Sequence, residues 1–128
     1  MKPITLEWIA KAEGDFHSCT REIRARKRPN YDSACFHAQQ CVEKYLKARL
    51  QEASLPFPKT HDLEEVLRRV LPVEPQWSAF KPAVAALNGY AIIFRYPGPS
   101  ATKKIARAAL KHCLHVRAIV RHSLGLAT

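Results

Sequence analysis

Five stretches of this chain repeat apolar residues at intervals of three and four, and this periodicity constrains the fold more than any other feature. No stretch alternates apolar and polar residues in the way that a half-buried strand would. Proline-containing segments separate the stretches, and proline interrupts a helix because it lacks an amide donor. The predicted helices are residues 5–27, 31–53, 60–71, 76–94 and 100–124. The pattern predicts an all-α protein.

The lengths of the helices and of their connections predict how they pack. Long amphipathic helices joined by short loops favour antiparallel neighbours, so we expect an up-and-down four-helix bundle with the third helix as a short accessory. A chain of 128 residues can bury a core of its own, and no repeat or linker divides it, so we expect one domain over residues 1–128. Thr5 and Thr60 are the expected N-caps of the first and third helices.

The second predicted helix has two regular faces. One is apolar, and the other carries a polar series at the same period, made up of Ser33, His37, Gln40, Lys44, Lys47 and Gln51. A lone bundle needs only one of these faces for its core, so we expect the protein to form a homodimer. Lys44 and Lys47 lie one turn apart, and the pattern predicts that both ammonium groups can reach one ligand.

The chain is strongly basic, with a formal charge of +10 from 21 Lys and Arg against 11 Asp and Glu. All the acidic residues lie at or before Glu74, so the C-terminal part carries the positive charge unopposed. Such a charge attracts anionic partners, among which nucleotides and nucleic acids come first. The alternative is that Lys and Arg only keep a small protein in solution. The basic run from Arg21 to Arg28 has the same two interpretations.

Several common functional motifs are absent. The chain contains neither of the glycine-rich phosphate loops, so side chains would have to hold any nucleotide. It also lacks the G-x-S-x-G and H-E-x-x-H motifs, and His112 and His115 have no carboxylate after them in the sequence. We therefore interpret these two histidines as surface residues and expect neither a metal site nor a cofactor.

The four cysteines and the hydropathy of the chain bear on where the protein resides. Cys19, Cys35, Cys41 and Cys113 fall within apolar helical patterns without C-x-x-C spacing, which predicts buried free thiols. No segment resembles a signal peptide or a membrane span. We expect a cytoplasmic protein with no membrane partner.

Four motifs occur in order along the chain: Phe36-His37-Ala38-Gln39-Gln40, Glu43-Lys44-Tyr45-Leu46-Lys47-Ala48, Lys59-Thr60-His61-Asp62-Leu63 and Phe94-Arg95-Tyr96-Pro97-Gly98. With these motifs the chain resembles the HEPN family, the "higher eukaryotes and prokaryotes nucleotide-binding" domain, over nearly its whole length. The resemblance implies an antiparallel helical bundle that is commonly a homodimer. It also implies a minimal nucleotidyltransferase as partner, in some members as a toxin–antitoxin module.

Many HEPN proteins are metal-independent ribonucleases that use an arginine followed four to six residues later by a histidine. Arg95 would supply the arginine, but no histidine follows it within that window. The pairs Arg107 with His112 and Arg117 with His122 match the spacing, but five residues along one helix place side chains about 140° apart. The sequence therefore favours a protein that is not an enzyme.

The leading hypothesis is a nonenzymatic HEPN domain that binds an ATP-like nucleotide or RNA and partners a nucleotidyltransferase. The candidate binding residues are His37, Gln40, Lys44, Lys47, His61, Arg95 and Tyr96, with no catalytic residue assigned. Lysine and arginine would contact phosphates, and tyrosine would stack on a base. The alternatives are a HEPN ribonuclease that takes its histidine from elsewhere in the bundle, or from a second subunit, and a purely structural dimerisation module.

Overall fold

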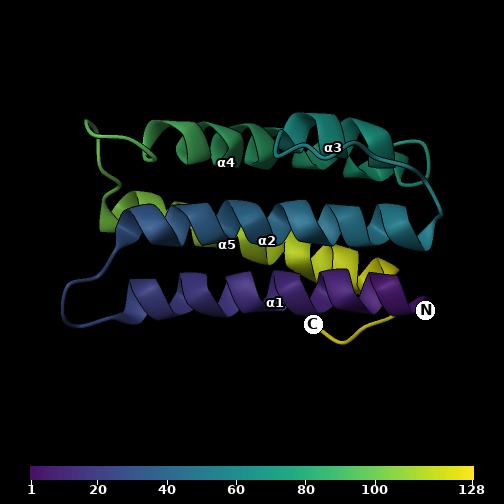
Figure 1. Ribbon diagram of the computed structural model, residues 1–128, viewed down its shortest axis with the longest axis horizontal. Helices are drawn as coiled ribbons and strands as arrows, with labels where there is room; N and C mark the ends of the chain where they lie inside the picture. The colour runs from purple at the N-terminus through teal and green to yellow at the C-terminus, as the bar shows by residue number, and fades with distance from the viewer.

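The computed structural model describes all 128 residues and consists of helices joined by loops (Figure 1). The elements are α1 (Pro3–Arg24), α2 (Tyr31–Glu52), α3 (Leu63–Val70), the 3-10 helix η1 (Pro75–Phe80), α4 (Lys81–Ile93) and α5 (Lys103–Ser123). The all-α prediction is confirmed, and the five predicted segments correspond to the five α-helices.

Helix α2 lies in the centre of the bundle. It runs beside α1 in the opposite direction, packs on α5, and is covered on another side by α3 and α4 (Figure 1). The four long helices form the antiparallel bundle, and the eight-residue α3 is the accessory helix, as the sequence predicts. None of the helices combines the length and apolar character needed to cross a bilayer.

The core is filled by aromatic, aliphatic and sulfur-containing side chains. Tyr45, Trp77 and Phe80 are its largest buried members. All four cysteines are free and buried, which confirms the prediction. Burial raises the pKa of the Cys19 thiol to about 12 and that of the Cys35 thiol to about 11, so both stay protonated at neutral pH.

Most helix ends lie within three residues of the predicted ones, and three helix starts differ in their cap or continuity. Helix α1 begins at Pro3, so Thr5 is not its cap; its hydroxyl is buried and donates to Glu52 Oε1 at 2.9 Å. Asp62, rather than Thr60, caps α3 and accepts a hydrogen bond from the Glu64 amide at 3.0 Å. The segment predicted as one helix from residue 76 is divided, because η1 precedes α4 and Pro82 occupies the first turn of α4, where its missing amide costs nothing.

The prediction that a lone bundle leaves one face of α2 uncovered is wrong. Because α2 contacts α1, α3, α4 and α5, several members of its polar series are enclosed within the monomer. Gln40 is 9% exposed and Lys47 is 5% exposed. The polar face therefore supplies internal ion pairs and hydrogen bonds, and it gives no argument for a homodimer.

Candidate functional site

Glu43 lies at the centre of a buried polar cluster between α2 and the loop before α3. Its carboxylate, 2% exposed, accepts hydrogen bonds from Lys47 Nζ at 3.1 Å and Gln39 Nε2 at 3.2 Å. The His61 ring approaches the same carboxylate with Nδ1 at 3.2 Å. Since the acceptor is a carboxylate, Nδ1 carries the proton, and Nε2 is left for another partner.

Lys47 ties the loop before α3 to α2. Besides Glu43, its ammonium group donates to the Thr60 carbonyl at 2.8 Å, and it lies 5.7 Å from the Trp8 ring and 5.8 Å from the Phe57 ring. Gln39 Nε2 donates to the His61 carbonyl at 3.2 Å. The loop is thus held at two successive carbonyls by side chains of one helix, which fixes the position of His61.

A cavity of about 330 Å³ opens beside this cluster, between α2, the loop before α3 and the last turns of α4. It is lined by Gln39, His61, Asp62, Asn88, Ala91, Ile92 and Arg95. The side chain of His61 is 78% exposed here, and the guanidinium of Arg95 makes no hydrogen bond or ion pair within the chain. The cavity therefore contains a histidine with a free nitrogen and an unpaired arginine.

Asp62 is the one acidic side chain in the cavity lining, and it is already engaged. Asn88 Nδ2 donates to its Oδ1 at 2.8 Å, and the Glu64 amide donates to the same oxygen at 3.0 Å. The Asn88 hydrogen bond is the main reason that the pKa of this carboxyl lies below its ordinary value. Asp62 thus serves as the cap of α3 and does not neutralise Arg95.

His37 and Lys44 belong to a different cluster, on the side of α2 that faces α1. Asp15 of α1 accepts a hydrogen bond from Lys44 Nζ and lies 2.7 Å from His37 Nδ1. The ammonium groups of Lys44 and Lys47 are therefore in separate ion pairs, and the expectation that both can reach one ligand is wrong.

The remaining candidate residues lie at the margins of the site. Gln40 Nε2 donates to Gln39 Oε1 at 2.8 Å and so supports the cluster from within. Tyr96 is 68% exposed in the loop after α4 and does not line the cavity. Of the seven candidates, only His61 and Arg95 line this cavity, while His37 and Lys44 meet at Asp15.

Sequence reasoning assigns no role in the site to Gln39, Glu43 and Asn88. Gln39 and Glu43 stand in the quoted motifs, but helical spacing indicates Glu43 only as the i, i+4 partner of Lys47, which it is. Asn88 has one usable signal, a polar residue within the apolar stretch of α4. Its Oδ1 accepts from the Leu63 amide at 3.0 Å, so it joins α4 to the start of α3.

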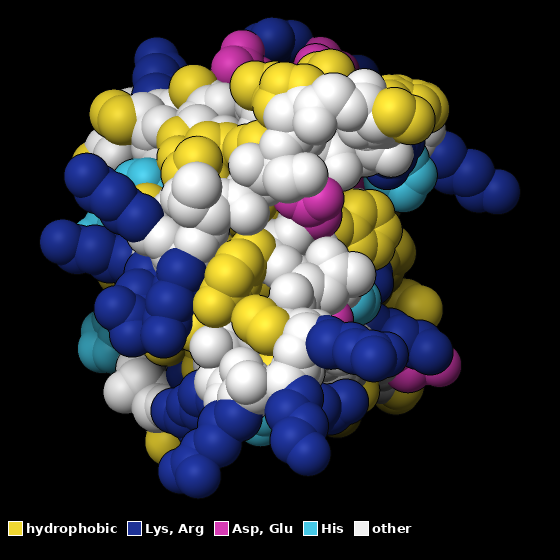
Figure 2. All heavy atoms as spheres, turned by 90° about the vertical axis from the view of Figure 1, so that its left-hand side faces the viewer, with side chains coloured by type: hydrophobic (Ala, Val, Ile, Leu, Met, Phe, Trp, Pro, Cys, Tyr) yellow, Lys and Arg dark blue, Asp and Glu magenta, His cyan; other side chains and the backbone are white.

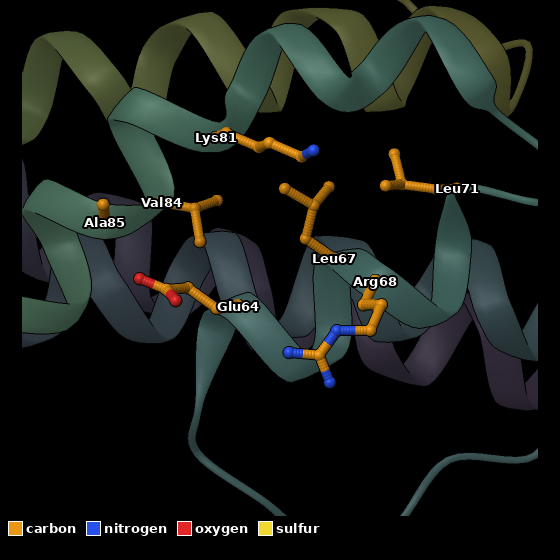
Figure 3. A pocket seen from close by; sticks show the side chains of 7 residues that line it. All are labelled: Glu64, Leu67, Arg68, Leu71, Lys81, Val84 and Ala85. Carbon is orange, nitrogen blue, oxygen red and sulfur yellow. The ribbon is translucent and has the colours of Figure 1, made fainter.

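A second cavity, of about 320 Å³, lies between α3 and the start of α4, away from these residues (Figure 3). Leu67 and Val84 form its floor, and Lys81 extends over it from α4, as Figure 3 shows. Arg68 at its edge is paired with Glu65 at 2.6 Å. None of the motif residues lines this groove, so we place the candidate site in the cavity that His61 and Arg95 line together.

Two further sequence interpretations can be compared with the structure. Nowhere in the chain do three or more His, Cys, Asp or Glu side chains gather in a way that could hold a metal ion. Arg117, one of the arginines with a histidine five residues later, forms a two-pronged ion pair with Glu13, with Nε at 2.8 Å and Nη2 at 2.6 Å. That arginine is part of the packing between α5 and α1.

Comparison with known proteins gives one family and one solved structure. The model of the HEPN domain matches residues 5–123 of this chain. The crystal structure of TT1696 from Thermus thermophilus superposes with a TM-score of 0.75 at 22% identity, covering 92% of this chain and 96% of that one. At this identity the likeness shows a common fold. None of the curated proteins matches the chain.

Proposed function

We propose that this chain, which belongs to the HEPN domain family, is a nonenzymatic nucleotide-binding partner of a minimal nucleotidyltransferase. The family match over residues 5–123 supports the domain assignment, and the role as a partner is what membership of such a family suggests. Free buried thiols and the net charge of +10 fit a cytoplasmic protein that binds anions. A homodimer and a toxin–antitoxin-like arrangement are parts of the same proposal.

One observation carries the nucleotide-binding proposal: Arg95, which has no internal partner, lines the same cavity as His61. A guanidinium can donate two parallel hydrogen bonds to a phosphate, and an imidazole that carries protons on both ring nitrogens can donate one more through Nε2. The volume of about 330 Å³ lies at the lower end of the range for small-molecule sites. We therefore assign the phosphate contacts to Arg95 and His61 and exclude Lys44 and Lys47 from direct contact.

The direct test is calorimetric titration of ATP into the wild type and into Arg95→Ala, His61→Ala and Lys44→Ala variants. We expect the first two substitutions to weaken binding by about tenfold or more each, because each removes a charge-assisted hydrogen bond. Lys44→Ala should leave the affinity nearly unchanged, since its ammonium is held by Asp15. Equal affinity in the wild type and Arg95→Ala would place the nucleotide elsewhere.

The proposed partnership is tested separately. We expect a nucleotidyltransferase encoded beside this chain to co-purify with it when both are expressed together. The absence of such a neighbouring gene, or of a complex, would contradict the partnership without affecting the nucleotide site.

A second candidate function is a metal-independent ribonuclease, and the position of His61 is the observation that favours it. The loop after Arg95 has no histidine, but His61 lines the cavity from another part of the chain, and Glu43 holds its Nδ1 at 3.2 Å. A carboxylate that orients an imidazole is a common arrangement for general acid–base catalysis. Cleavage of single-stranded RNA in the presence of a chelator, lost in both His61→Ala and Arg95→Ala, would favour this function over the first.

A further inference from the structure

The end of the bundle that carries the α1–α2 and α4–α5 loops is both apolar and strongly basic (Figure 2). Large apolar side chains are exposed there in the last turn of α4 and the loop after it: Ile92 is 70% exposed, Ile93 is 50% exposed and Tyr96 is 68% exposed. Phe36, in the first turns of α2, is 38% exposed. Exposed apolar side chains that gather in this way mark a contact surface.

Unpaired cations lie beside this apolar group. Figure 2 shows Lys and Arg side chains along the lower and left-hand margins of this end, with hydrophobic side chains in the middle and the upper part. The Lys and Arg residues of the end of α1, the α1–α2 loop, the end of α4 and the start of α5 are exposed and make no hydrogen bond or ion pair; they are Arg21, Arg24, Arg26, Lys27, Arg28, Arg95, Lys103, Lys104 and Arg107. The nearby carboxylate of Asp32 accepts from the Ala101 amide at 2.6 Å.

Three kinds of occupant can be compared on these observations. A second copy of the chain would bring the same cations face to face at the apolar contact, which opposes association. A nucleic acid would satisfy the cations and could stack on Tyr96 and Phe36, but it offers nothing to the aliphatic side chains of Ile92 and Ile93. An anionic lipid surface satisfies both, because its headgroups attract the cations and its interfacial region accepts exposed aliphatic and aromatic side chains.

We propose that this end of the bundle, which we call the basic end, docks on an anionic lipid surface. Ile93 at the end of α4 and Tyr96 in the loop after it enter the interfacial layer, and the cations of the α1–α2 loop and the start of α5 contact the headgroups. The expectation of no membrane partner rested on the absence of a spanning segment, and a peripheral contact requires none. Ile93 and Tyr96 do not line the cavity with Arg95, so docking and nucleotide binding are separable.

Co-sedimentation of the full chain with lipid vesicles tests this proposal. We expect binding to phosphatidylcholine vesicles that contain phosphatidylglycerol, little binding to phosphatidylcholine alone, and a steep loss as salt rises from about 50 to 200 mM. Two double variants should each weaken binding by about tenfold or more: Ile93→Ser/Tyr96→Ser, which removes the apolar tip, and Lys103→Glu/Lys104→Glu, which reverses two headgroup contacts. Glutamate suits the first turn of α5, so the second variant should fold.

The matched control is Lys11→Glu/Lys81→Glu, which changes the net charge by the same amount through two exposed, unpaired lysines of α1 and of the start of α4. It should bind within about twofold to threefold of the wild type, because its charges lie away from the contact. Equal binding of all variants, or of neutral and anionic vesicles, would overturn the proposal. So would failure to bind vesicles combined with tight binding of single-stranded RNA that is indifferent to Ile93→Ser/Tyr96→Ser.

Discussion

Lysine and arginine side chains are paired with carboxylates in the middle of the bundle but are unpaired at its basic end. In the middle, cations are paired with carboxylates inside or between helices: Lys47 with Glu43, Lys44 with Asp15, and Arg117 with Glu13. At the basic end, the cations of the α1–α2 loop, Arg95 and the start of α5 have no partner within the chain. The basic end therefore carries positive charge for which the chain provides no ion-pair partner.

This difference assigns different roles to the two regions. A buried cation must be paired, since an unpaired charge in the interior costs several kcal/mol. Removing its carboxylate therefore lowers the stability of the fold. An exposed, unpaired cation contributes little to stability and remains available to an anionic ligand. Substitutions in the middle should change the free energy of unfolding, whereas substitutions at the basic end should change binding.

The largest effect on stability is expected from Glu43→Ala. The substitution leaves the Lys47 ammonium buried without its carboxylate and removes the acceptor of Gln39 and His61, so we expect a loss of about 3–5 kcal/mol in the free energy of unfolding. Urea denaturation followed by circular dichroism measures it. Glu65→Ala, which breaks exposed pairs with Arg68 and Arg69, is the control and should cost less than about 1 kcal/mol. Equal losses in the two variants would contradict the distinction.

A smaller loss of stability is expected from Arg117→Met, which removes the ion pair between α5 and α1 in the middle of the bundle. Arg117 donates twice to Glu13 and lies 4.4 Å from the centre of the Phe16 ring, and Met keeps most of the apolar stem. Loss of the charged hydrogen bonds should cost about 1.5–3 kcal/mol at pH 7, measured by the same urea titrations. A neutral outcome would show that α1 and α5 are held together by apolar packing alone.

The pH dependence of the free energy of unfolding should reflect the ion pair between Arg117 and Glu13. The hydrogen bond from Arg117 lowers the pKa of Glu13 below its ordinary value of 4.5. A carboxyl whose pKa is lowered on folding contributes stability that is fully present above its unfolded pKa and is lost as the pH falls through the folded value. The difference in stability between wild type and Arg117→Met should therefore be constant near neutrality and shrink below about pH 4.5. A constant difference down to about pH 3 would mean that Glu13 does not carry it.

The fold could be predicted from the sequence because the signals are local. Apolar residues at helical spacing and the prolines between the stretches determine helices to within a few residues, and short loops determine antiparallel packing. The errors at Thr5 and Thr60 arise because several polar residues near a helix start can serve as cap, and tertiary contacts decide among them. Thr5 is taken into the contact with Glu52 instead.

The candidate site was less predictable, because periodicity shows which residues share a face but not what covers that face. The spacing of Lys44 and Lys47 is the same whether the helix is peripheral or central. Only the packing of α1 and of the loop before α3 on α2 shows that one ammonium faces Asp15 and the other Glu43. The motifs indicate His61 and Arg95, but their common cavity requires α4 to lie beside that loop.

The smallest effect on stability is expected at the residue with the largest proposed effect on ligand binding. Arg95 follows the last turn of α4, is exposed, and makes no ion pair or hydrogen bond, so Arg95→Ala should change the free energy of unfolding by less than about 0.5 kcal/mol. Lys44→Ala should do the reverse: it leaves Asp15 with only His37, so it should destabilise the protein measurably while ATP affinity stays nearly unchanged.

Thermal unfolding measures the stability of both variants, and calorimetric titration measures their affinity for ATP. If Arg95→Ala destabilises the protein as much as Lys44→Ala, then Arg95 is part of the packing and its unpaired state is not a sign of a ligand. If it is neutral for folding and ATP affinity falls at least about tenfold, unpaired cations are the ones that this bundle uses for its partners.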